Sequence, residues 1–417
     1  MPSPEANQPE GGTEGGTVSA WASLGIRDFR LLWFGSVFAT TAREMRLVVN
    51  FYLVFELTGD PLQLGLTGLF QAIPIMLFGL FGGALADLLD RRKLLMATQV
   101  LGMIPALALG VLAMTGGIEV WHIFLATFAT SATSTLEFPA RMAYMVRLVP
   151  RSHLLNAITL NSLLNQTAFF IGPALTGLVV LVGVDGTFFF NAGLFVPGLL
   201  AIAMIRTSGA PEGERQGASL KMIVEGVRFI SREKILLSML AMDFGVVMVG
   251  FFRPLLTVLA KDVFGVGAVG LGFLNAAPAV GSVLASSTIL IRGRIRRQGA
   301  TFLTAVFLYS ASLSLLGAAP WYGLGLLAAG LLGYTDSISV AVRQNLTQLV
   351  APDAMRGRAT GFSVMSASLG NAIGSMEAGF VAAIIGAAAT LTFGGVAAMV
   401  FVLACGFGWK ELWRHRV

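Results

Sequence analysis

Three ionisable side chains interrupt the first long apolar segment of the chain. The stretch "FATTAREMRLVVNFYLVF", residues 38–55, carries Arg43, Glu44 and Arg46 near its middle. On a helix, Arg43 and Arg46 share a face with Asn50 one turn further along, whereas Glu44 points about 100° away from Arg43. Guanidinium groups bind anions, and a carboxyl group shielded from water can take up a proton near neutral pH. These residue types therefore point to ion or proton chemistry in apolar surroundings.

The composition excludes an ordinary soluble protein. Of the 417 residues, 55% are apolar and 12% are charged, and the mean hydropathy is +0.78. Soluble domains carry about 25% charged residues. Long apolar runs separated by short charged loops are typical of a polytopic helical membrane protein. Residues 1–22 have no basic region followed by an apolar core, so we expect a disordered tail rather than a signal peptide.

Metal, nucleic-acid and enzyme chemistry are not expected. Cys405 is the single cysteine, and His122, His153 and His415 lack the spacing of metal ligands. The net charge of +6 comes from basic residues in short loops, which indicates membrane orientation rather than nucleic-acid binding. The sequence offers no nucleophile–base arrangement and no G-x4-G-K-[ST] loop, so ATP is not the expected energy source.

Hydropathy and length predict twelve membrane-spanning helices, since about 20 residues are needed to cross the bilayer. Basic residues gather in the loops on one side, and only Lys261 is basic on the other side. The positive-inside rule therefore predicts that both termini are cytoplasmic. The predicted spans are 30–56, 62–86, 93–115, 120–147, 155–181, 184–206, 236–260, 266–291, 299–318, 321–348, 359–384 and 387–408.

The sequence repeats at an offset of 202 residues. Arg141 aligns with Arg343 and Gly172 with Gly374 at this offset. Two parallel repeats of six spans are one of the architectures of transporters, with the substrate near the midplane between them. The predicted parts are a disordered cytoplasmic tail (1–22), an N-terminal six-helix half (23–206), a cytoplasmic linker with an amphipathic helix (207–235), a C-terminal half (236–408) and a second cytoplasmic tail (409–417).

Other apolar spans also carry ionisable residues, at different depths. Glu137 and Asp336 lie deep in spans four and ten. A charge at the bilayer centre costs about 2.5–3.5 kcal/mol on insertion scales, so such residues face a cavity or a partner. Arg141 and Arg343 lie near the ends of their spans, where snorkelling predicts a structural anchor. An internal set of ion pairs that steadies helix packing is the alternative for each charged residue.

The loop after span two carries the first family motif. The stretch "GGALADLLDRRKLL" resembles the major facilitator superfamily motif G-x3-D-[RK]-x-G-[RK]-[RK]. Leu88 and Asp90 depart from it, at positions that are usually basic and glycine. The resemblance implies an all-α fold of two pseudo-symmetric six-helix halves and a loop that locks them in one access state. The alternative role is topology-setting basic residues. The matching residues are Gly83, Asp87, Arg91 and Arg92.

A narrower resemblance points to exporters. The stretches "FRLLWFG", "LVFELTGDPLQLGL", "FPARMAYMVRLVPRSHLLNAITLNSL" and "VAPDAMRGRA" resemble the bacterial branch of macrolide-efflux and enterobactin-exporter-type proteins. In span five "GPALTG" resembles the end of the antiporter motif, whose earlier glycines are missing. Gly172, Pro173 and Gly177 are expected to provide close helix packing and a kink. Span four lacks the RxxQG pattern of many proton-coupled drug exporters, so their proton relay is not expected here.

The resemblance gives the charged residues expected roles, because spans one, four, seven and ten line the central cavity in this superfamily. Proton coupling is expected of Glu44, Glu137 or Asp336. For the amides in the set below, interhelical packing is the alternative role. The cavity residues are Arg43, Arg46, Asn50, Arg253, Gln71, Asn165, Gln166 and Glu377, and the anchors at the cytoplasmic ends are Arg141, Arg343, Arg356 and Arg358.

The sequence thus predicts an alternating-access transporter in the bacterial cytoplasmic membrane. The first hypothesis is proton-driven export of an amphipathic, anionic organic molecule, with the proton gradient in place of a cofactor. The first alternative is a lysophospholipid or lipid flippase, and the second is a non-transporting membrane scaffold or sensor. The expected partners are the small-molecule substrate and the lipid bilayer, with no nucleic acid and a monomeric chain.

Overall fold

A computed structural model describes residues 21–210, 228, 230–292, 297–350 and 352–408. Within the helices, it does not describe the side chains of residues 80–87, 155, 166, 170, 234, 348, 353–362, 364 and 407–408. Most of the predicted linker helix and tails lie outside the described residues. So do the side chains of Gly83, Asp87, Gln166, Arg356 and Arg358.

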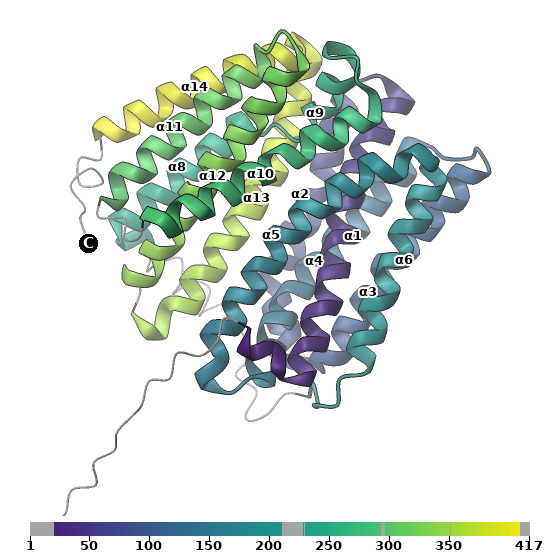
Figure 1. Cartoon of the computed structure of the whole chain (residues 1–417), viewed down its shortest axis with the longest axis vertical. Helices are drawn as coiled ribbons and strands as arrows, with labels where there is room; N and C mark the ends of the chain where they lie inside the picture. Colours follow the sequence, from purple (N-terminus) through teal and green to yellow (C-terminus); the bar gives the residue numbers. More distant parts are fainter. Residues whose placement is uncertain (1–20, 211–227, 229, 293–296, 351, 409–417) are drawn as a thin grey trace, which may run out of the picture.

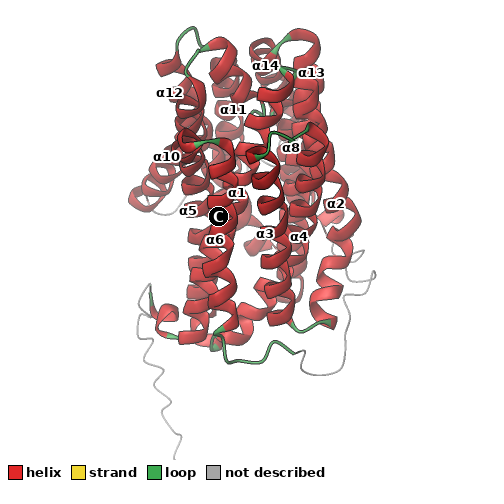
Figure 2. Cartoon of the chain, turned by 90° about the vertical axis from the view of Figure 1, so that its right-hand side faces the viewer, coloured by secondary structure: helices red, strands yellow, loops and turns green. Residues whose placement is uncertain are grey.

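The described part of the chain is built of helices joined by short loops, with no strand among the described residues (Figure 2). The all-α expectation is therefore confirmed. The long helices are α1 (Arg27–Thr58), α2 (Pro61–Leu88), α3 (Arg91–Met114), α4 (Val120–Leu148), α5 (Leu154–Val179), α6 (Val184–Ala203), α8 (Lys234–Gly250), α10 (Gly267–Arg292), α11 (Gln298–Gly317), α12 (Tyr322–Val350), α13 (Asp353–Ile385) and α14 (Ala387–Gly408).

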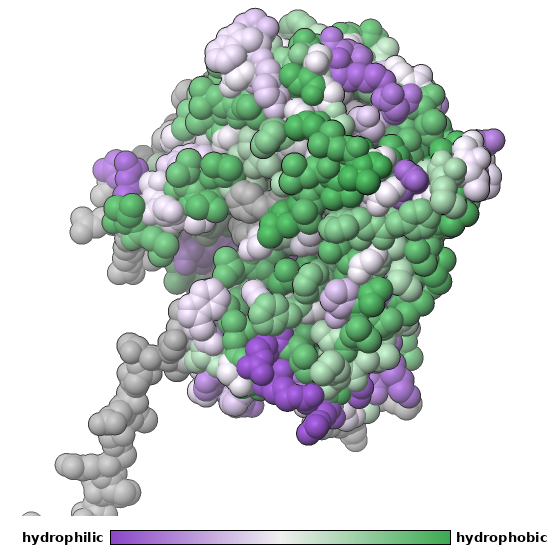
Figure 3. Space-filling model, turned by 45° about the vertical axis from the view of Figure 1, so that its right-hand side comes forward, coloured by the Kyte–Doolittle hydropathy of each residue, from purple (hydrophilic) through white to green (hydrophobic). Residues whose placement is uncertain are grey.

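The helices are long and apolar enough to form a multi-pass membrane protein. Ten described segments meet the length and hydropathy of a membrane span. Apolar side chains cover much of the visible surface between more polar ends (Figure 3). Of the predicted spans, α1 and α4 fall outside these ten, because Arg43, Glu44 and Arg46 lower the hydropathy of α1, and Glu137 and Arg141 that of α4. The count of twelve stays a prediction for these two helices.

Local capping residues fix where several helices begin and end. Asp90, which departs from the family motif, is the N-cap of α3, and its side chain accepts hydrogen bonds from the backbone of Arg92 at 2.9 Å and Lys93 at 3.1 Å. Such a cap satisfies backbone N–H groups that the first helical turn leaves free. Gly59 ends α1 with φ of 62°, a left-handed conformation that favours glycine.

The seventh predicted span, 236–260, is not one continuous helix. It comprises α8, a non-helical break at Phe251 and Phe252, and then α9 (Leu255–Val258), which continues as a π-helix over Leu259–Val263. Pro254 precedes α9, and proline cannot supply the N–H that a continuous helix needs. The break places Arg253 between the two helical pieces.

Two groups of helices form two halves, α1–α6 and α8–α14, which lie side by side (Figure 1). We call the end where α2 meets α3 the basic end, because Arg91, Arg92 and Lys93 lie there, and the other end the opposite end. The halves meet where α2 packs on α13 and where α5 packs on α10. A Cβ added to Gly177 of α5 would lie 2.6 Å from Cα of Gly272 in α10, so this contact requires glycine.

Candidate functional site

An ion pair joins the two halves at mid-depth. A guanidinium nitrogen of Arg253, at the break in span seven, donates to the carboxylate of Glu44 in α1 at 3.0 Å. The guanidinium also lies 3.7 Å from the ring centroid of Phe169 in α5, a cation–π distance. The side chains of Arg253 and Glu44 keep 11% and 24% of their surface exposed. The pair is therefore partly accessible to water or to a solute.

A second group of charges lies within the first half. Arg43 of α1 forms an ion pair with Glu137 of α4 and donates to Thr40 at 2.9 Å. Arg141, one turn beyond Glu137, donates to Thr40 at 3.2 Å and to Asn165 of α5 at 3.3 Å. We call Arg43, Glu137 and Arg141 the first-half triad, in which one carboxylate lies among two guanidinium groups.

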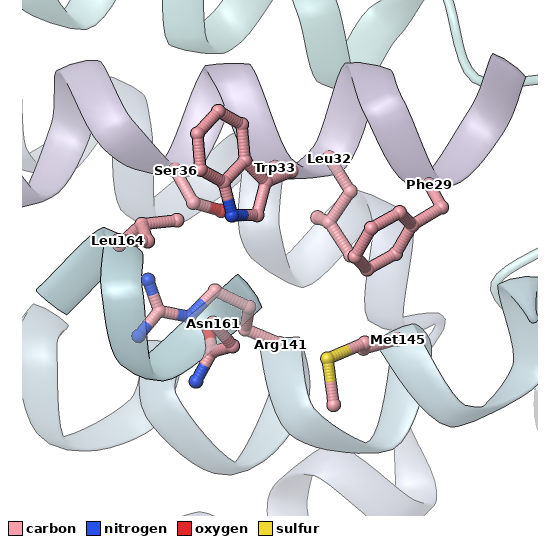
Figure 4. A pocket seen from close by; sticks show the side chains of 8 residues that line it. All are labelled: Phe29, Leu32, Trp33, Ser36, Arg141, Met145, Asn161 and Leu164. Carbon is pink, nitrogen blue, oxygen red and sulfur yellow. The ribbon is translucent and has the colours of Figure 1, made fainter. Parts of the chain in front are cut away.

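Arg141 also lines a small cavity between α1, α4 and α5 (Figure 4). Its volume is about 10 Å³, which is close to the space of a single water molecule. The buried Nε of Arg141 has no hydrogen-bond partner among the described residues, and Ser36 and Asn161 supply polar atoms nearby. The cavity is otherwise lined by Phe29, Leu32, Trp33, Met145 and Leu164.

Arg46 and Asn50 lie on one face of α1, as the helical spacing predicts. That face packs against helices of the first half. Arg46 is only 1% exposed and donates twice to the amide oxygen of Asn191 in α6, at 3.0 and 2.7 Å. A third bond reaches Thr130 of α4 at 2.9 Å, and Asn50 donates to Thr127 at 3.0 Å. Neutral oxygens thus satisfy this buried guanidinium, away from the Glu44–Arg253 pair.

The second half contains a polar cavity of about 110 Å³ between α8, α12 and α13. Asp243 of α8 forms an ion pair with Arg343 of α12 on its wall. Asp336, midway along α12, also lines the cavity and is exposed to it. Among the described residues, no cation pairs with Asp336 and no hydrogen bond reaches its carboxylate. We call Asp243, Asp336 and Arg343 the second-half triad.

The remaining predicted residues lie at helix contacts. Gly172 lies against α1, where an added Cβ would be 2.6 Å from Cβ of Glu44, and Pro173 follows it in α5. The backbone oxygen of Gln71 accepts a hydrogen bond from Ser131 of α4 at 2.7 Å. Glu377 of α13 is half-buried, and one carboxylate oxygen has no partner among the described residues.

Arg91 and Arg92, two residues of the family motif in the loop after α2, contact the end of α6 and the segment that follows it. Arg92 donates to the backbone oxygens of Ile202 at 3.2 Å and Ala203 at 2.5 Å. The backbone N–H of Arg91 donates to the oxygen of Gly209 at 2.9 Å. These contacts lie within the first half and fix the start of the connection between the halves.

Asp28, which the sequence reasoning missed, strengthens the same attachment. Its carboxylate accepts bonds from the backbone N–H of Arg206 and from the N–H and hydroxyl of Thr207, at 3.2, 2.9 and 2.6 Å. Burial alone would raise the pKa of Asp28, but these hydrogen bonds and nearby Arg27 hold it below its usual value. An acidic residue in the first turn of a helix is the signal that could have drawn attention to it.

Sequence reasoning missed Phe169, and it noted Asp243 only as a candidate interfacial residue of span seven. Phe169 had no distinguishing pattern, because aromatic residues are common throughout the apolar spans. Asp243 was visible as an ionisable residue two turns into span seven, yet its partner was not.

Comparisons with known proteins agree with this architecture. A family model described as a transmembrane secretion effector matches residues 18–409. The multidrug efflux pump Tap of Mycolicibacterium fortuitum is 25% identical over 372 residues, 86% of this chain and 90% of that protein. The enterobactin exporter EntS of Escherichia coli O1:K1 is 25% identical over 339 residues, 80% of each chain.

A solved structure shares the fold. The crystal structure of a bacterial homologue of the human lysosomal transporter Spinster, in an inward-facing and unoccupied conformation, superposes with a TM-score of 0.69. The superposition covers 93% of this chain and 96% of the Spinster homologue, at 16% sequence identity.

Proposed function

Because this chain belongs to the transmembrane secretion effector family of the major facilitator superfamily, we propose that it exports an amphipathic, anionic organic molecule in exchange for protons. The expected superfamily membership is thereby confirmed, and the chain is an efflux or secretion transporter rather than an enzyme. The proposal adds the coupling ion and the chemical class of the substrate.

One observation carries the proton coupling. Of the carboxylates first considered for it, Glu44 pairs with Arg253 and Glu137 with Arg43, whereas Asp336 has no cation partner among the described residues. A carboxylate in an ion pair has its countercharge beside it, whereas a carboxylate without a cation partner inside a membrane protein carries an uncompensated charge that a proton removes. Asp336, exposed to a cavity of about 110 Å³, is therefore the group we assign to proton uptake and release.

The position of Arg253 supports an anionic substrate. It lies at the junction of the halves, where a substrate crossing near the midplane would pass. Its guanidinium is held between Glu44 and the ring of Phe169, and it is partly exposed. An incoming carboxylate or catecholate can replace Glu44 as its partner, because both form the same charge-assisted hydrogen bonds. The aromatic ring offers a contact for the apolar part of the molecule.

The charge pattern supports a cytoplasmic location of the basic end. Arg91, Arg92, Lys93 and Arg147 lie there, in agreement with the positive-inside rule. The glycine contact between α5 and α10 lies toward the opposite end. In this arrangement the halves are closed toward the outer side, and loading of the exporter takes place from the cytoplasm. The membrane that fits the exporters it resembles is the bacterial cytoplasmic membrane.

Flux into proteoliposomes tests the proposal. Purified protein is reconstituted with an imposed pH gradient, and movement of enterobactin, a macrolide and a labelled lysophospholipid is followed separately. We expect the anionic solute to move, and its movement to stop when the gradient is collapsed or in Asp336→Asn. The matched control is Asp262→Asn, because Asp262 is an exposed carboxylate at the opposite end.

Three results would contradict parts of the proposal. Unchanged flux in Asp336→Asn removes the assigned proton site. Movement of lysophospholipid alone replaces export of organic anions by a lipid flippase. Absence of flux for all solutes, with a membrane partner bound instead, favours a scaffold or sensor.

A further inference from the structure

The two triads occupy matching places in the two halves but carry opposite charge imbalances. Arg141 and Arg343 are equivalent by the offset of 202 residues, and each contacts the first helix of its own half, at Thr40 in α1 and Asp243 in α8. In the first-half triad two guanidinium groups share one carboxylate. The second-half triad contains two carboxylates and one guanidinium group, which pairs with Asp243. The first triad therefore has an excess positive charge, and the second an excess negative charge.

We propose that Asp243 and Asp336 hold one exchangeable proton between them, and that Arg343 is their shared counter-ion. This inference rests on the proposed function and adds Asp243 to the proton site and Arg343 as a positioning residue. Arg343 was expected to be a structural anchor, and its contact with Asp243 gives it a second role. When Asp336 is protonated, Arg343 and Asp243 form a neutral pair. When Asp336 loses its proton, both carboxylates compete for the one guanidinium.

Electrostatics favours a single proton at this place. Two ionised carboxylates with one cation leave an uncompensated negative charge inside a membrane protein, which is costly. A single proton on this pair of carboxylates removes that charge. The cavity of about 110 Å³ has room for a few water molecules, which can carry the proton between the carboxylates.

Few other charged or titratable groups face Asp336. The described groups that act on it are Asp243 of α8, Arg343 of its own helix and Arg253 at the break in span seven. Tyr309 of α11 is buried nearby, and the polar residues that α13 adds to the cavity wall, Ser366 and Asn371, are neutral. Arg343 is the cation on the cavity wall, so its choice of partner decides the charge of the site.

The first-half triad cannot serve in the same way. Glu137 already pairs with Arg43 and lies one turn from Arg141, so its carboxylate has two guanidinium groups beside it. Loss of that charge would leave two buried guanidinium groups without a carboxylate. The charge imbalance thus favours the second half as the place of the exchangeable proton.

Infrared titration of the reconstituted protein tests the inference without any transport measurement. The protonated carboxyl band is followed against pH in the wild type and in variants. We expect a titrating band that disappears in Asp336→Asn and persists in the control Asp262→Asn. In Asp243→Asn the midpoint falls by about one pH unit or more, because Arg343 becomes free to pair with Asp336. In Arg343→Gln the midpoint rises by a similar amount, because the counter-ion is lost.

The opposite signs distinguish a shared counter-ion from a merely structural role. Arg343→Lys keeps the positive charge, so the pH midpoint of the carboxyl band should stay near that of the wild type. If Arg343→Gln fails to fold, the direction of the midpoint shift in Asp243→Asn tests the inference by itself. Suppose that Asp336→Asn abolishes the titrating band, and that Asp243→Asn leaves the midpoint of the band unchanged. This result overturns the inference of a shared counter-ion and leaves the proposed proton site at Asp336 intact. A titrating band that survives in Asp336→Asn overturns both.

Discussion

Arg253 of the second half lies 3.0 Å from the carboxylate of Glu44 in the first half, with its guanidinium over the ring of Phe169. The three side chains come from α1, α5 and the break in span seven, so they connect parts of the chain that must separate if the halves rock apart. Any solute that takes Arg253 away from Glu44 loosens this connection.

The first prediction concerns the competition for Arg253. Glu44→Gln removes the internal anion, so we expect tighter binding of an anionic solute, by severalfold. Arg253→Gln removes the binding cation, and the affinity for the same solute should fall about tenfold or more, as expected for loss of a charge-assisted hydrogen bond. Equilibrium binding of enterobactin to purified protein measures both effects.

A neutral macrolide serves as the comparison solute for this pair of variants. Its binding should change little in either variant, because it does not need the guanidinium. Equal losses for the charged and the neutral solute in Arg253→Gln would show that the substitution disturbs the fold, and would contradict a direct role in anion binding.

The second prediction concerns the stability of the first half. Glu137→Gln leaves Arg43 without its carboxylate partner, and breaking a buried pair in this way costs about 3–5 kcal/mol of unfolding free energy. Adding Arg43→Gln should recover part of the loss, because the unpaired charge is removed as well. Denaturant unfolding of the wild type, the two single variants and the double variant, each purified in detergent, measures these free energies.

The control pair is Lys261 with Glu56, an exposed ion pair at 2.9 Å that joins the two halves. Its side chains are 43% and 46% exposed, so removing it should change the unfolding free energy by less than about 1 kcal/mol. If Glu137→Gln costs no more than this exposed pair, the first-half triad is not held together by its charges.

The third prediction is a pH dependence at the basic end. Asp28 has a pKa below its usual value of 3.8, so the stability that it contributes is present above that value and is lost as the pH falls through the lowered pKa. Asp28→Asn should lower the unfolding free energy at neutral pH by about 1.5–3 kcal/mol, the range for hydrogen bonds to a charged group. The difference between variant and wild type should shrink toward about pH 3.

Melting temperatures of both proteins across that pH range provide the measurement. Thr207→Val is the companion variant, since it removes one of the three donors and leaves the carboxylate charged. A difference between wild type and Asp28→Asn that stays constant at every pH would contradict the role assigned to the charge.

The helical membrane fold could be predicted from the sequence, because hydropathy, loop charge and a repeat are properties of many residues together. The break in span seven could not, since Arg253 and Pro254 lie in an apolar run that reads as continuous. Periodicity correctly placed Arg46 and Asn50 on one face of α1. It could not say which neighbour that face meets, and Asn191 comes from α6, 145 residues from Arg46.

Partners of charged residues were the least predictable part of the candidate site. Each ion pair in the triads joins two helices, so it depends on the packing of helices and not on local spacing. Arg343 appeared as an anchor because of its depth alone, and the nearby Asp243 changes that interpretation. The amino-acid types limited the chemistry to ions and protons, and the packing decided which residues act together.

The last prediction concerns the contact between α5 and α10. A leucine at Gly177 would meet the backbone of Gly272, which an added Cβ already approaches to 2.6 Å, so the halves could not close at the opposite end. We expect Gly177→Leu to insert and fold but to lose at least about tenfold in flux, because alternating access requires a state in which the halves are closed at this end. Gly193→Leu is the matched control, since nothing lies within 4 Å of a Cβ at that position of α6. Distances between spin labels on α5 and α10 should increase in the first variant and stay unchanged in the second. Wild-type flux in Gly177→Leu would mean that this contact is not part of the transport cycle.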